Sequence, residues 1–348
     1  MQKTVCIFKA RIPQIINWDP DSIYTGVSGS EESIIYSAEA LKDKGYKVFV
    51  LNNIQNKEQY STASANPCYA GYLRGDHFFD FTILHDEANF TNILRPRTRK
   101  LYFLPNNTCR ESLHKHDIEA FDDILWLSSY QRNQWISINP GLMRFTKIFG
   151  NALNKTQFKP VQQRRNPYSC IYASDYARGL YILLTIWPNI KNKFPMAILD
   201  IYYGLKNWGI MSREEEQFIR DRIQVLKIDG VTDHGQVGHE ELTNAFSTTS
   251  LWTYPCTYPE TFCITALKAQ LSGAVPVILE TAALSETVKF GFKCSIKEHY
   301  EDLLLEVMGN IERISIEERK DMGRFVLDNF TWEEITSRWV HLFESSSD

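Results

Sequence analysis

Hydrophobic and polar residues follow two different periods in this chain, and the two periods alternate along the sequence. In the first half, short and nearly continuous apolar runs recur at residues 4–8, 47–51, 79–84, 100–104 and 123–128. Runs of this length predict strands that are buried on both faces, as in a parallel sheet. Between the first two runs the period lengthens, and residues 30–44 place Ile34, Ile35, Ala38 and Leu41 on one side of a predicted helix.

The ends of this first helix carry start and stop signals. Ser28 and Glu31 have the spacing of a capping box, in which the two side chains satisfy backbone N–H groups of the first turn. Gly45 can take the left-handed conformation that often ends a helix. We therefore expect a capped amphipathic helix between the first two strands.

The second half repeats the alternation of strands and helices. Predicted strands cover residues 168–174, 196–204, 223–230, 250–255 and 274–279. Predicted helices cover residues 178–187, which end at Pro188, residues 239–246, and a stretch that runs from Glu260 to a stop at Gly273. Alternation of this kind is typical of an α/β architecture with parallel sheets.

One polar segment separates the two halves. Residues 154–167 contain two prolines and show no hydrophobic period, which is typical of a linker. A chain of 348 residues is also long for a single core. We predict two α/β domains of similar size, whose ligands would bind beyond the carboxyl ends of the strands.

Composition narrows the class of protein. The formal net charge is −4, with 23% charged residues, whereas a nucleic-acid-binding domain is expected to carry a basic surface. The seven cysteines are scattered without a C-x-x-C pair, which favours reduced thiols over a disulfide framework or a zinc ribbon. The first apolar run is too short for a signal peptide, and none approaches the length of a membrane span. We expect a cytoplasmic protein with at most peripheral membrane contact.

The first junction of interest joins a strand to a helix at residues 24–33. Gly26 and Gly29 would let backbone N–H groups approach an anion at the helix N-terminus, where the helix dipole also favours negative charge. The segment lacks a G-x-G-x-x-G pattern and the Lys-Ser/Thr pair of a phosphate loop. A plain glycine turn is the alternative interpretation.

A second junction, at residues 172–184, collects Ser174, Asp175 and Arg178 at the end of a predicted strand. A guanidinium beside helix N–H groups is well suited to bind a diphosphate with two hydrogen bonds. The alternative is that Arg178 pairs with Asp175 at the surface of the first helical turn.

The third junction places Glu260 between a strand and a helix. An acidic residue there is favoured by the helix dipole in any protein, which is the structural alternative. A carboxylate accepts hydrogen bonds only, and sugar hydroxyls are donors in need of acceptors. Residues 261–264 would add backbone N–H groups at the start of the helix.

Histidine clusters are weaker candidates. His114 and His116 lie beside Asp117 in a charged loop, where solvated surface is the more common outcome. Asp233, His234 and His239 could likewise suggest a metal site, but His239 is expected to open a helix and His234 to lie at a strand-end turn. His85 follows a predicted strand and could supply acid–base chemistry, although a structural hydrogen-bonded role fits it equally well.

Taken together, these residues resemble the GT-B glycosyltransferases, most closely the retaining glycosyltransferases of family 4. The strongest match is YPETFCITALKAQLSGAVPV, residues 258–277, which is similar to the family's Pro-Glu-x-Phe signature and its following Gly-x-Pro-Val. Further similar segments are residues 26–48, 149–158, 172–204, 231–242 and 330–343. The resemblance thus spans almost the whole chain.

The resemblance implies an architecture. It implies two Rossmann-like domains that face a cleft, an acceptor-binding domain over residues 1–158 and a nucleotide-sugar-binding domain over 159–328. Residues 329–348 would form a helix that crosses back to the first domain. It also implies transfer of a sugar from a nucleotide sugar, such as a UDP- or GDP-sugar, to a hydroxyl of a glycan or glycoconjugate. Transfer would proceed with retention, without a metal or other cofactor.

The resemblance also implies roles for particular residues. Glu260 and Arg178 would be catalytic, holding the donor's sugar and diphosphate. From its position after a strand of the first domain, His85 is also predicted to be catalytic. Further donor contacts would come from Gly26, Gly29, Ser174, His234, Thr261, Phe262, Cys263, Ile264 and Lys268. Asn106 and His85 would contact the acceptor. No metal ligand is expected.

Two departures from the family pattern bear on activity. Lys268 stands where the family has a second Glu that commonly accepts hydrogen bonds from the ribose, and an ammonium has no acceptor lone pair. After the strand at 100–104 the family often has a histidine, whereas this chain has Pro105, Asn106 and Asn107. The alternative function is a GT-B protein that binds nucleotide sugar or glycan without turnover. A dinucleotide oxidoreductase is disfavoured, because no glycine fingerprint is present.

Overall fold

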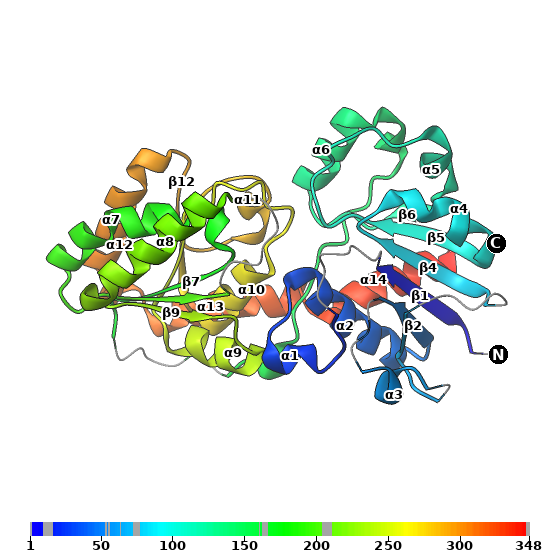
Figure 1. The fold of residues 1–348 in the computed structure, drawn as a ribbon, viewed down its shortest axis with the longest axis horizontal. Helices are drawn as coiled ribbons and strands as arrows, with labels where there is room; N and C mark the ends of the chain where they lie inside the picture. The colour runs from blue at the N-terminus through cyan, green and yellow to red at the C-terminus, as the bar shows by residue number, and fades with distance from the viewer. Residues whose placement is uncertain are drawn as a thin grey trace. The chain divides into compact units, whose positions relative to one another are not determined.

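The computed structural model describes residues 2–9, 17–52, 54, 56–62, 64–71, 77–159, 161, 166–203 and 211–345. By contacts the chain divides into two compact units. The first contains residues 1–23, 27–154 and 330–348, and the second contains residues 24–26 and 155–329. Each unit is built around one six-stranded sheet in which every pairing between named strands is parallel (Figure 1).

The first sheet has the order β3-β2-β1-β4-β5-β6. Its strands are β1 (Thr4–Lys9), β2 (Lys47–Leu51), β3 (Cys68–Ala70), β4 (Phe79–His85), β5 (Thr98–Leu104) and β6 (Asp123–Ile124). The helices in this part of the chain are α1 (Ser22–Thr25), α2 (Gly29–Asp43), α3 (Lys57–Tyr60), α4 (Thr91–Leu94), α5 (Lys115–Ala120), α6 (Ser129–Ile138) and α14 (Trp332–Ser345). The continuous apolar runs therefore form the predicted buried strands, and only the short edge strand β3 was not anticipated.

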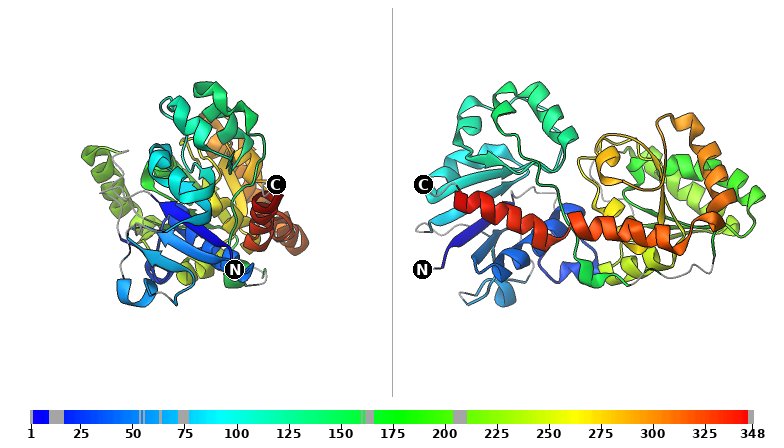
Figure 2. Two further views of the ribbon diagram at one scale, coloured as in Figure 1. Left: turned by 90° about the vertical axis from the view of Figure 1, so that its right-hand side faces the viewer. Right: turned by 180° about the vertical axis from the view of Figure 1, so that it is seen from behind.

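The last helix, α14, packs within the first unit against α2 and the sheet (Figure 2). The ring of Phe343 stacks on that of Phe81 with 4.7 Å between centroids and lies 4.9 Å from that of Tyr102. Lys44 Nζ also donates a hydrogen bond to Ser337 Oγ at 2.8 Å. Burying such large aromatic rings contributes several kcal/mol, on the order of 2–3 kcal/mol for each ring.

The second sheet has the order β12-β11-β10-β7-β8-β9. Its strands are β7 (Ser169–Ala173), β8 (Ile198–Tyr202), β9 (Val231–Gly235), β10 (Leu251–Tyr254), β11 (Val275–Leu279) and β12 (Phe292–Cys294). The helices are α7 (Leu180–Lys193), α8 (Arg213–Leu226), α9 (His239–Thr248), α10 (Ile264–Ser272), α11 (Leu284–Thr287), α12 (Tyr300–Asn310) and α13 (Ile316–Asn329). In Figure 1 the sheet lies between α7, α8 and α12 on one face and α9, α10 and α13 on the other.

Short 3-10 helices complete the description. They are η1 (Ala88–Phe90), η2 (Arg95–Arg97), η3 (Pro140–Arg144), η4 (Lys155–Gln157), η5 (Tyr176–Arg178), η6 (Lys227–Asp229), η7 (Lys297–His299) and η8 (Ile311–Arg313). The predicted linker, residues 154–167, includes η4, while its residues 160 and 162–165 lie outside the described residues, as does residue 204 of a predicted strand.

Two predicted elements of the second unit are wrong. The helix predicted to end at Pro188 continues as α7 to Lys193. Proline removes the N–H that would bond Leu184 O, but Arg222 Nε donates to that carbonyl at 3.2 Å instead. Residues 223–230, predicted as a strand, are the end of α8 and η6. A capping box of Ser212 and Glu215 starts α8 and sets its helical register.

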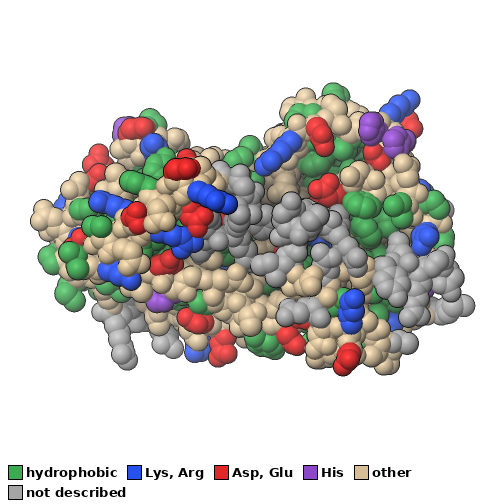
Figure 3. Space-filling model, in the orientation of Figure 1, with side chains coloured by type: hydrophobic (Ala, Val, Ile, Leu, Met, Phe, Trp, Pro, Cys, Tyr) green, Lys and Arg blue, Asp and Glu red, His purple; other side chains and the backbone are tan. Residues whose placement is uncertain are grey.

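The surface carries charges of both signs (Figure 3), and the cysteines are unpaired. On the face drawn in Figure 3, Lys and Arg side chains lie among those of Asp and Glu. All seven cysteines are free thiols, and five of them are buried. Among the described residues, no helix is both long and apolar enough to cross a membrane.

Candidate functional site

The second sheet reverses its strand order between β7 and β10. From β7 the chain leads outward to β8 and β9, whereas β10 leads to β11 and β12 on the other side. Ligands of parallel α/β sheets bind at the carboxyl edge of such a reversal, because the loops from the two neighbouring strands diverge there. Ser174 and Arg178 follow β7, and Glu260 follows β10, so these three predicted residues belong to the loops at the reversal.

Arg178 and Glu260 form a hydrogen-bonded ion pair at this position. Arg178 Nη1 lies 2.7 Å from Glu260 Oε1. The guanidinium also lies over the ring of Tyr258, 4.7 Å from its centroid. Asp175 instead accepts a hydrogen bond from Ala177 N and caps η5. The side-chain partner of Arg178 is therefore Glu260, and the alternative pairing with Asp175 is wrong.

Burial and charge give this pair a defined electrostatic state. The Glu260 side chain is 7% exposed and that of Arg178 is 32% exposed. Burial alone would lower the pKa of Arg178, but the Glu260 carboxylate outweighs this and raises the pKa well above its usual value. Arg178 Nε is buried and, within the described part of the chain, has no hydrogen-bond partner. A permanent cation with a spare donor thus lies directly beside a carboxylate.

Gly179 explains how the two loops come together. It has a φ of +102°, a left-handed conformation that favours glycine. A Cβ at this position would lie 2.0 Å from the carbonyl oxygen of Pro255, which follows β10. Only a residue without a side chain lets the loop after β7 approach the backbone after β10 this closely. The contact brings Arg178 within reach of Glu260.

Two hydroxyl groups extend the pair into a small network. Tyr254 is fully buried, and its hydroxyl donates a hydrogen bond to Glu260 Oε1 at 2.5 Å. Ser174 Oγ lies 3.1 Å from the same hydroxyl. Burial raises the pKa of Tyr254 well above its usual range, so the phenol keeps its proton. Sequence reasoning missed Tyr254, because a Tyr in an apolar strand is ordinarily a core residue.

The segment after Glu260 differs from the prediction. Helix α10 begins at Ile264, four residues after Glu260, and its N-cap Cys263 has a φ of +74°. A left-handed cysteine costs about 1–2 kcal/mol relative to a right-handed one. The side chains of Phe262 and Ile264 are buried. Lys268 lies one turn into α10 and is only 6% exposed, so it is not a freely mobile surface lysine.

His234 lies farther along the same edge of the sheet. It is near the end of β9, which is separated from β7 by β8. Its Nε2 lies 2.8 Å from Asp200 Oδ1, and its ring stacks on Tyr202 at 4.4 Å between centroids. The described structure shows no contact of His234 with the Arg178–Glu260 pair. Its donor-binding role stays a prediction, as do those of Thr261, Phe262, Cys263, Ile264 and Lys268.

The first sheet also reverses its order, between β1 and β4, and a second charged network lies at the carboxyl ends of these strands. Lys9 ends β1 in register with His85 of β4. Lys9 Nζ donates to Asp86 and to Ser30 Oγ, and lies 3.6 Å from Glu31 Oε1. Burial would lower the pKa of Lys9, but Asp86 and Glu31 raise it overall. Burial would raise the pKa of Asp86, but Lys9 holds it well below its usual value.

This network overturns the predicted capping box of α2. Ser28 is the N-cap residue, but its side chain makes no capping hydrogen bond. Glu31 is 4% exposed and faces Lys9 instead. The Glu31 carboxylate therefore lies beside the buried Lys9 ammonium, where each charge compensates the other. Sequence reasoning missed Lys9, although a charged residue at the end of an apolar strand was the available signal.

His85 and Asn106, both predicted to contact the acceptor, are hydrogen-bonded to each other in this network, and His85 is buried. Its ring is 2% exposed, and Asn106 Nδ2 lies 2.6 Å from its Nδ1. Asn106 Nδ2 also donates to Asp86 Oδ1 at 2.6 Å. Burial lowers the pKa of His85, so the imidazole is neutral at pH 7. Catalytic and acceptor-binding roles of these residues stay predictions.

The two predicted glycines lie at different positions. Gly29 is the first residue of α2, where its N–H is one of the unsatisfied donors of the helix N-terminus. Gly26 has a φ of +103° and groups by contacts with the second unit. No described interaction separates an anion-binding role from a plain glycine turn.

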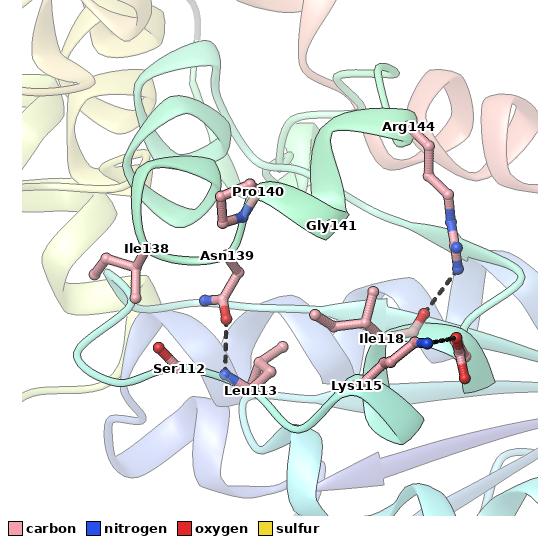
Figure 4. A pocket seen from close by; sticks show the side chains of 10 residues that line it. Ser112, Leu113, Lys115, Ile118, Ile138, Asn139, Pro140, Gly141 and Arg144 are labelled. Atoms are coloured by element: carbon pink, nitrogen blue, oxygen red, sulfur yellow. Dashed lines mark hydrogen bonds and ion pairs between the residues drawn. The ribbon is translucent and has the colours of Figure 1, made fainter.

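A pocket of about 380 Å³ lies elsewhere in the first unit, between α5, the end of α6 and η3 (Figure 4). Two of its polar side chains already have hydrogen-bond partners. Asn139 Oδ1 accepts from Leu113 N at 2.7 Å, and Arg144 Nη2 donates to Ile118 O at 2.8 Å. The residues that line this pocket include none of the predicted site residues. Among the described residues, no group of three or more His, Cys, Asp or Glu side chains could hold a metal ion.

Comparisons with known proteins address the fold. Models of protein families gave no match, and neither did curated protein sequences. Among solved structures, a sucrose-phosphate synthase from Thermosynechococcus elongatus has a TM-score of 0.76 at 14% identity, covering 99% of both chains. HepE from Anabaena, solved with UDP, has a TM-score of 0.72 at 11% identity, covering 99% of this chain and 100% of that one. A glycosyltransferase from Rickettsia africae has a TM-score of 0.73 at 11% identity, covering 100% of both chains.

These similarities, together with the two parallel sheets, confirm the predicted fold class. The chain has the GT-B fold. At such low identity the likeness establishes the fold alone, so the activity has to be argued from the residues at the two strand-order reversals.

Proposed function

We propose that this protein is a glycosyltransferase that moves a sugar from a nucleotide-diphosphate sugar to a hydroxyl of a glycan or glycoconjugate. The observation that carries the proposal is the Arg178–Glu260 pair at the carboxyl edge of β7 and β10. It combines the two chemistries such a donor needs, a cation for the diphosphate and a carboxylate for sugar hydroxyls. The UDP and UDP-glucose complexes of HepE have the same fold, which makes uridine donors the first to test.

The geometry suggests how the donor is held. Nη1 of Arg178 is engaged with Glu260, whereas Nε has no hydrogen-bond partner among the described residues and is a donor left for a phosphate oxygen. The Glu260 carboxylate then lies on the sugar side of the diphosphate. As the bond between the anomeric carbon and the phosphate oxygen breaks, its electron pair moves to the diphosphate. Arg178 stabilises this developing charge, usually the largest catalytic contribution.

We further propose that transfer occurs with retention and without a metal. The acceptor oxygen bonds to the anomeric carbon, and its proton goes to the departing diphosphate. Arg178 would supply charge stabilisation that a metal ion provides in other transferases. Chelation by EDTA should then leave the rate unchanged, and the anomeric coupling constant of the product, measured by NMR, should match that of the donor.

The test is release of nucleotide from a donor in the presence of candidate glycan acceptors, with and without EDTA. Acceptor-dependent release that is insensitive to EDTA supports the proposal. A second candidate is a protein that binds nucleotide sugar without turnover, and the buried Lys268 in place of the family's Glu favours it. Saturable donor binding without release with any acceptor would support that candidate instead.

Lys268 leads to a specific prediction. Replacing Lys268 with Glu is expected to tighten binding of UDP about tenfold, because a carboxylate offers the ribose hydroxyls an acceptor that an ammonium lacks. Titration calorimetry measures the change, and thermal unfolding confirms that the variant is folded. Lys268→Met, which removes the charge without adding an acceptor, is the control and should not tighten binding. Unchanged or weaker binding by folded Lys268→Glu would contradict the prediction.

A further inference from the structure

The hydrogen bonds around Tyr254 have a fixed direction. The Glu260 carboxylate accepts a hydrogen bond from the Arg178 guanidinium, and the single proton of the Tyr254 hydroxyl is donated to the same carboxylate. Ser174 lies 3.1 Å from the same hydroxyl, whose proton is already committed. Ser174 Oγ must therefore donate to the Tyr254 oxygen. The result is a series of hydrogen bonds in which Ser174 donates to Tyr254 and Tyr254 donates to Glu260.

Both strong contacts of the Glu260 side chain converge on one oxygen. Arg178 Nη1 and the Tyr254 hydroxyl bond to Oε1, and Cys256 Sγ lies 4.0 Å from the same atom. In the described part of the chain, no hydrogen bond is made by Oε2. Two donors at different angles to Oε1 fix the plane of the carboxylate, and so fix the direction in which Oε2 points.

The position of Tyr254 is itself rigid. Its ring is fully buried, stacked on Trp252 at 5.0 Å and packed against Tyr172 at 5.8 Å between centroids. Because the Tyr254 ring is held in place by this packing, its hydrogen bond restricts the position of the Glu260 carboxylate. The Arg178 side chain, which is 32% exposed, offers a less constrained anchor.

We propose that Tyr254 is a positioning residue for the donor sugar: it holds Glu260 Oε1 so that Oε2 is free and aimed to accept from a sugar hydroxyl. This inference rests on the proposed function. It implies a donor with a hydroxyl within reach of Oε2. It also implies that the chain discriminates between a nucleotide sugar and the nucleoside diphosphate alone through Tyr254, which touches neither ligand.

The test compares two ligands on two phenylalanine variants. Wild type, Tyr254→Phe and Tyr300→Phe are titrated with UDP-glucose and with UDP, and with GDP-mannose and GDP. Tyr300 is the control, because it is equally buried and its hydroxyl, which donates to Val277 O at 2.8 Å and lies beside the Tyr254 backbone, makes no described hydrogen bond to Glu260. Tyr254→Phe is expected to weaken nucleotide-sugar binding about tenfold, while the affinity for the nucleoside diphosphate changes less than twofold. Tyr300→Phe should leave the affinity for the nucleotide sugar and the affinity for the nucleoside diphosphate unchanged.

The outcomes separate the inference from the function on which it rests. Suppose that wild type binds a nucleotide sugar. If Tyr254→Phe weakens the binding of the nucleotide sugar and of the nucleoside diphosphate equally, or changes the binding of neither, the inference is overturned and the proposed function stands. If wild type binds none of the four ligands, both fail. Should Tyr254→Phe not fold, Ser174→Ala removes the donor to Tyr254, and a two- to threefold loss confined to the nucleotide sugar supports the inference. A loss shared with the diphosphate overturns it.

Discussion

Replacing Arg178 with Ala should weaken binding of UDP and of UDP-glucose more than a hundredfold. The variant loses the only guanidinium hydrogen-bonded to Glu260 among the described residues, and with it the cation assigned to the diphosphate. It also leaves a carboxylate that is 7% exposed next to an empty volume. The remaining negative charge would repel the diphosphate, which adds to the loss. Titration calorimetry on the folded variant measures the effect.

The same substitution should destabilise the fold by about 2–3 kcal/mol, because a charge-assisted hydrogen bond is lost and its buried acceptor stays behind. Arg338→Ala is the matched control, since Arg338 makes an exposed i,i+4 pair with Glu334. Its stability should change by less than about 0.5 kcal/mol, and its ligand binding not at all. Arg178→Ala that binds UDP-glucose as wild type does would remove Arg178 from the site.

Replacing Lys9 with Met should lower the free energy of unfolding by about 3–5 kcal/mol, because Asp86 and Glu31, whose side chains are 9% and 5% exposed, lose their shared counter-charge. Urea unfolding measures the change. Lys115→Met is the control, since Lys115 is 88% exposed and its pair with Glu119 is at the surface. The control should change stability by less than about 0.5 kcal/mol. A comparably small effect at Lys9 would contradict the network described here.

The contribution of Lys9 should also depend on pH in a defined way. The folded-state pKa of Asp86 is depressed, so its contribution is complete above the unfolded pKa of about 4 and is lost as pH falls below it. The pKa of Lys9 is raised, so its contribution is complete below about pH 10 and is lost at higher pH. The stability difference between wild type and Lys9→Met should be level from about pH 5 to 9 and shrink on both sides. A difference that does not change between pH 3 and 7 would contradict this.

The sequence predicted most strands of both sheets because their signal is local, whereas β3, β9 and β12 were not predicted. A strand buried on both faces is mostly apolar, and β7, β10 and β11 are buried at every residue. β1, β2, β4 and β5 each contain an apolar run that is largely buried. Residues 223–230 show the limit of that signal. Ile223 and Leu226 are spaced for the buried side of a helix, and a short apolar run alone does not separate the two periods.

The candidate site was predictable in its residue types but not in its contacts. Arg178 and Glu260 were singled out because each follows a strand, yet they are 82 residues apart and meet only because β7 and β10 are neighbours. Strand order is a property of the whole sheet and cannot be derived from either segment alone. Tyr254 and Lys9 were missed for the same reason, since their importance comes from what they touch across the reversal.

The assignment of Glu31 shows a second kind of limit. Its spacing from Ser28 is that of a capping box, and the local pattern is correct. In the folded chain Lys9 Nζ lies 3.6 Å from Glu31 Oε1. Glu31 therefore faces Lys9, a residue distant in sequence, and the Ser28 side chain makes no capping hydrogen bond. Local patterns therefore predict the helix well, while the orientation of its charged side chains depends on the tertiary structure.

The most direct test of the central claim, that the Arg178–Glu260 site holds a nucleotide sugar, is calorimetric titration of the wild-type protein with UDP-, GDP-, ADP- and dTDP-sugars. The proposal predicts saturable binding of one donor with a stoichiometry of about one per chain, and loss of that binding in Arg178→Ala. Absence of binding to every donor would contradict the claim and would leave the GT-B likeness as a statement about the fold alone.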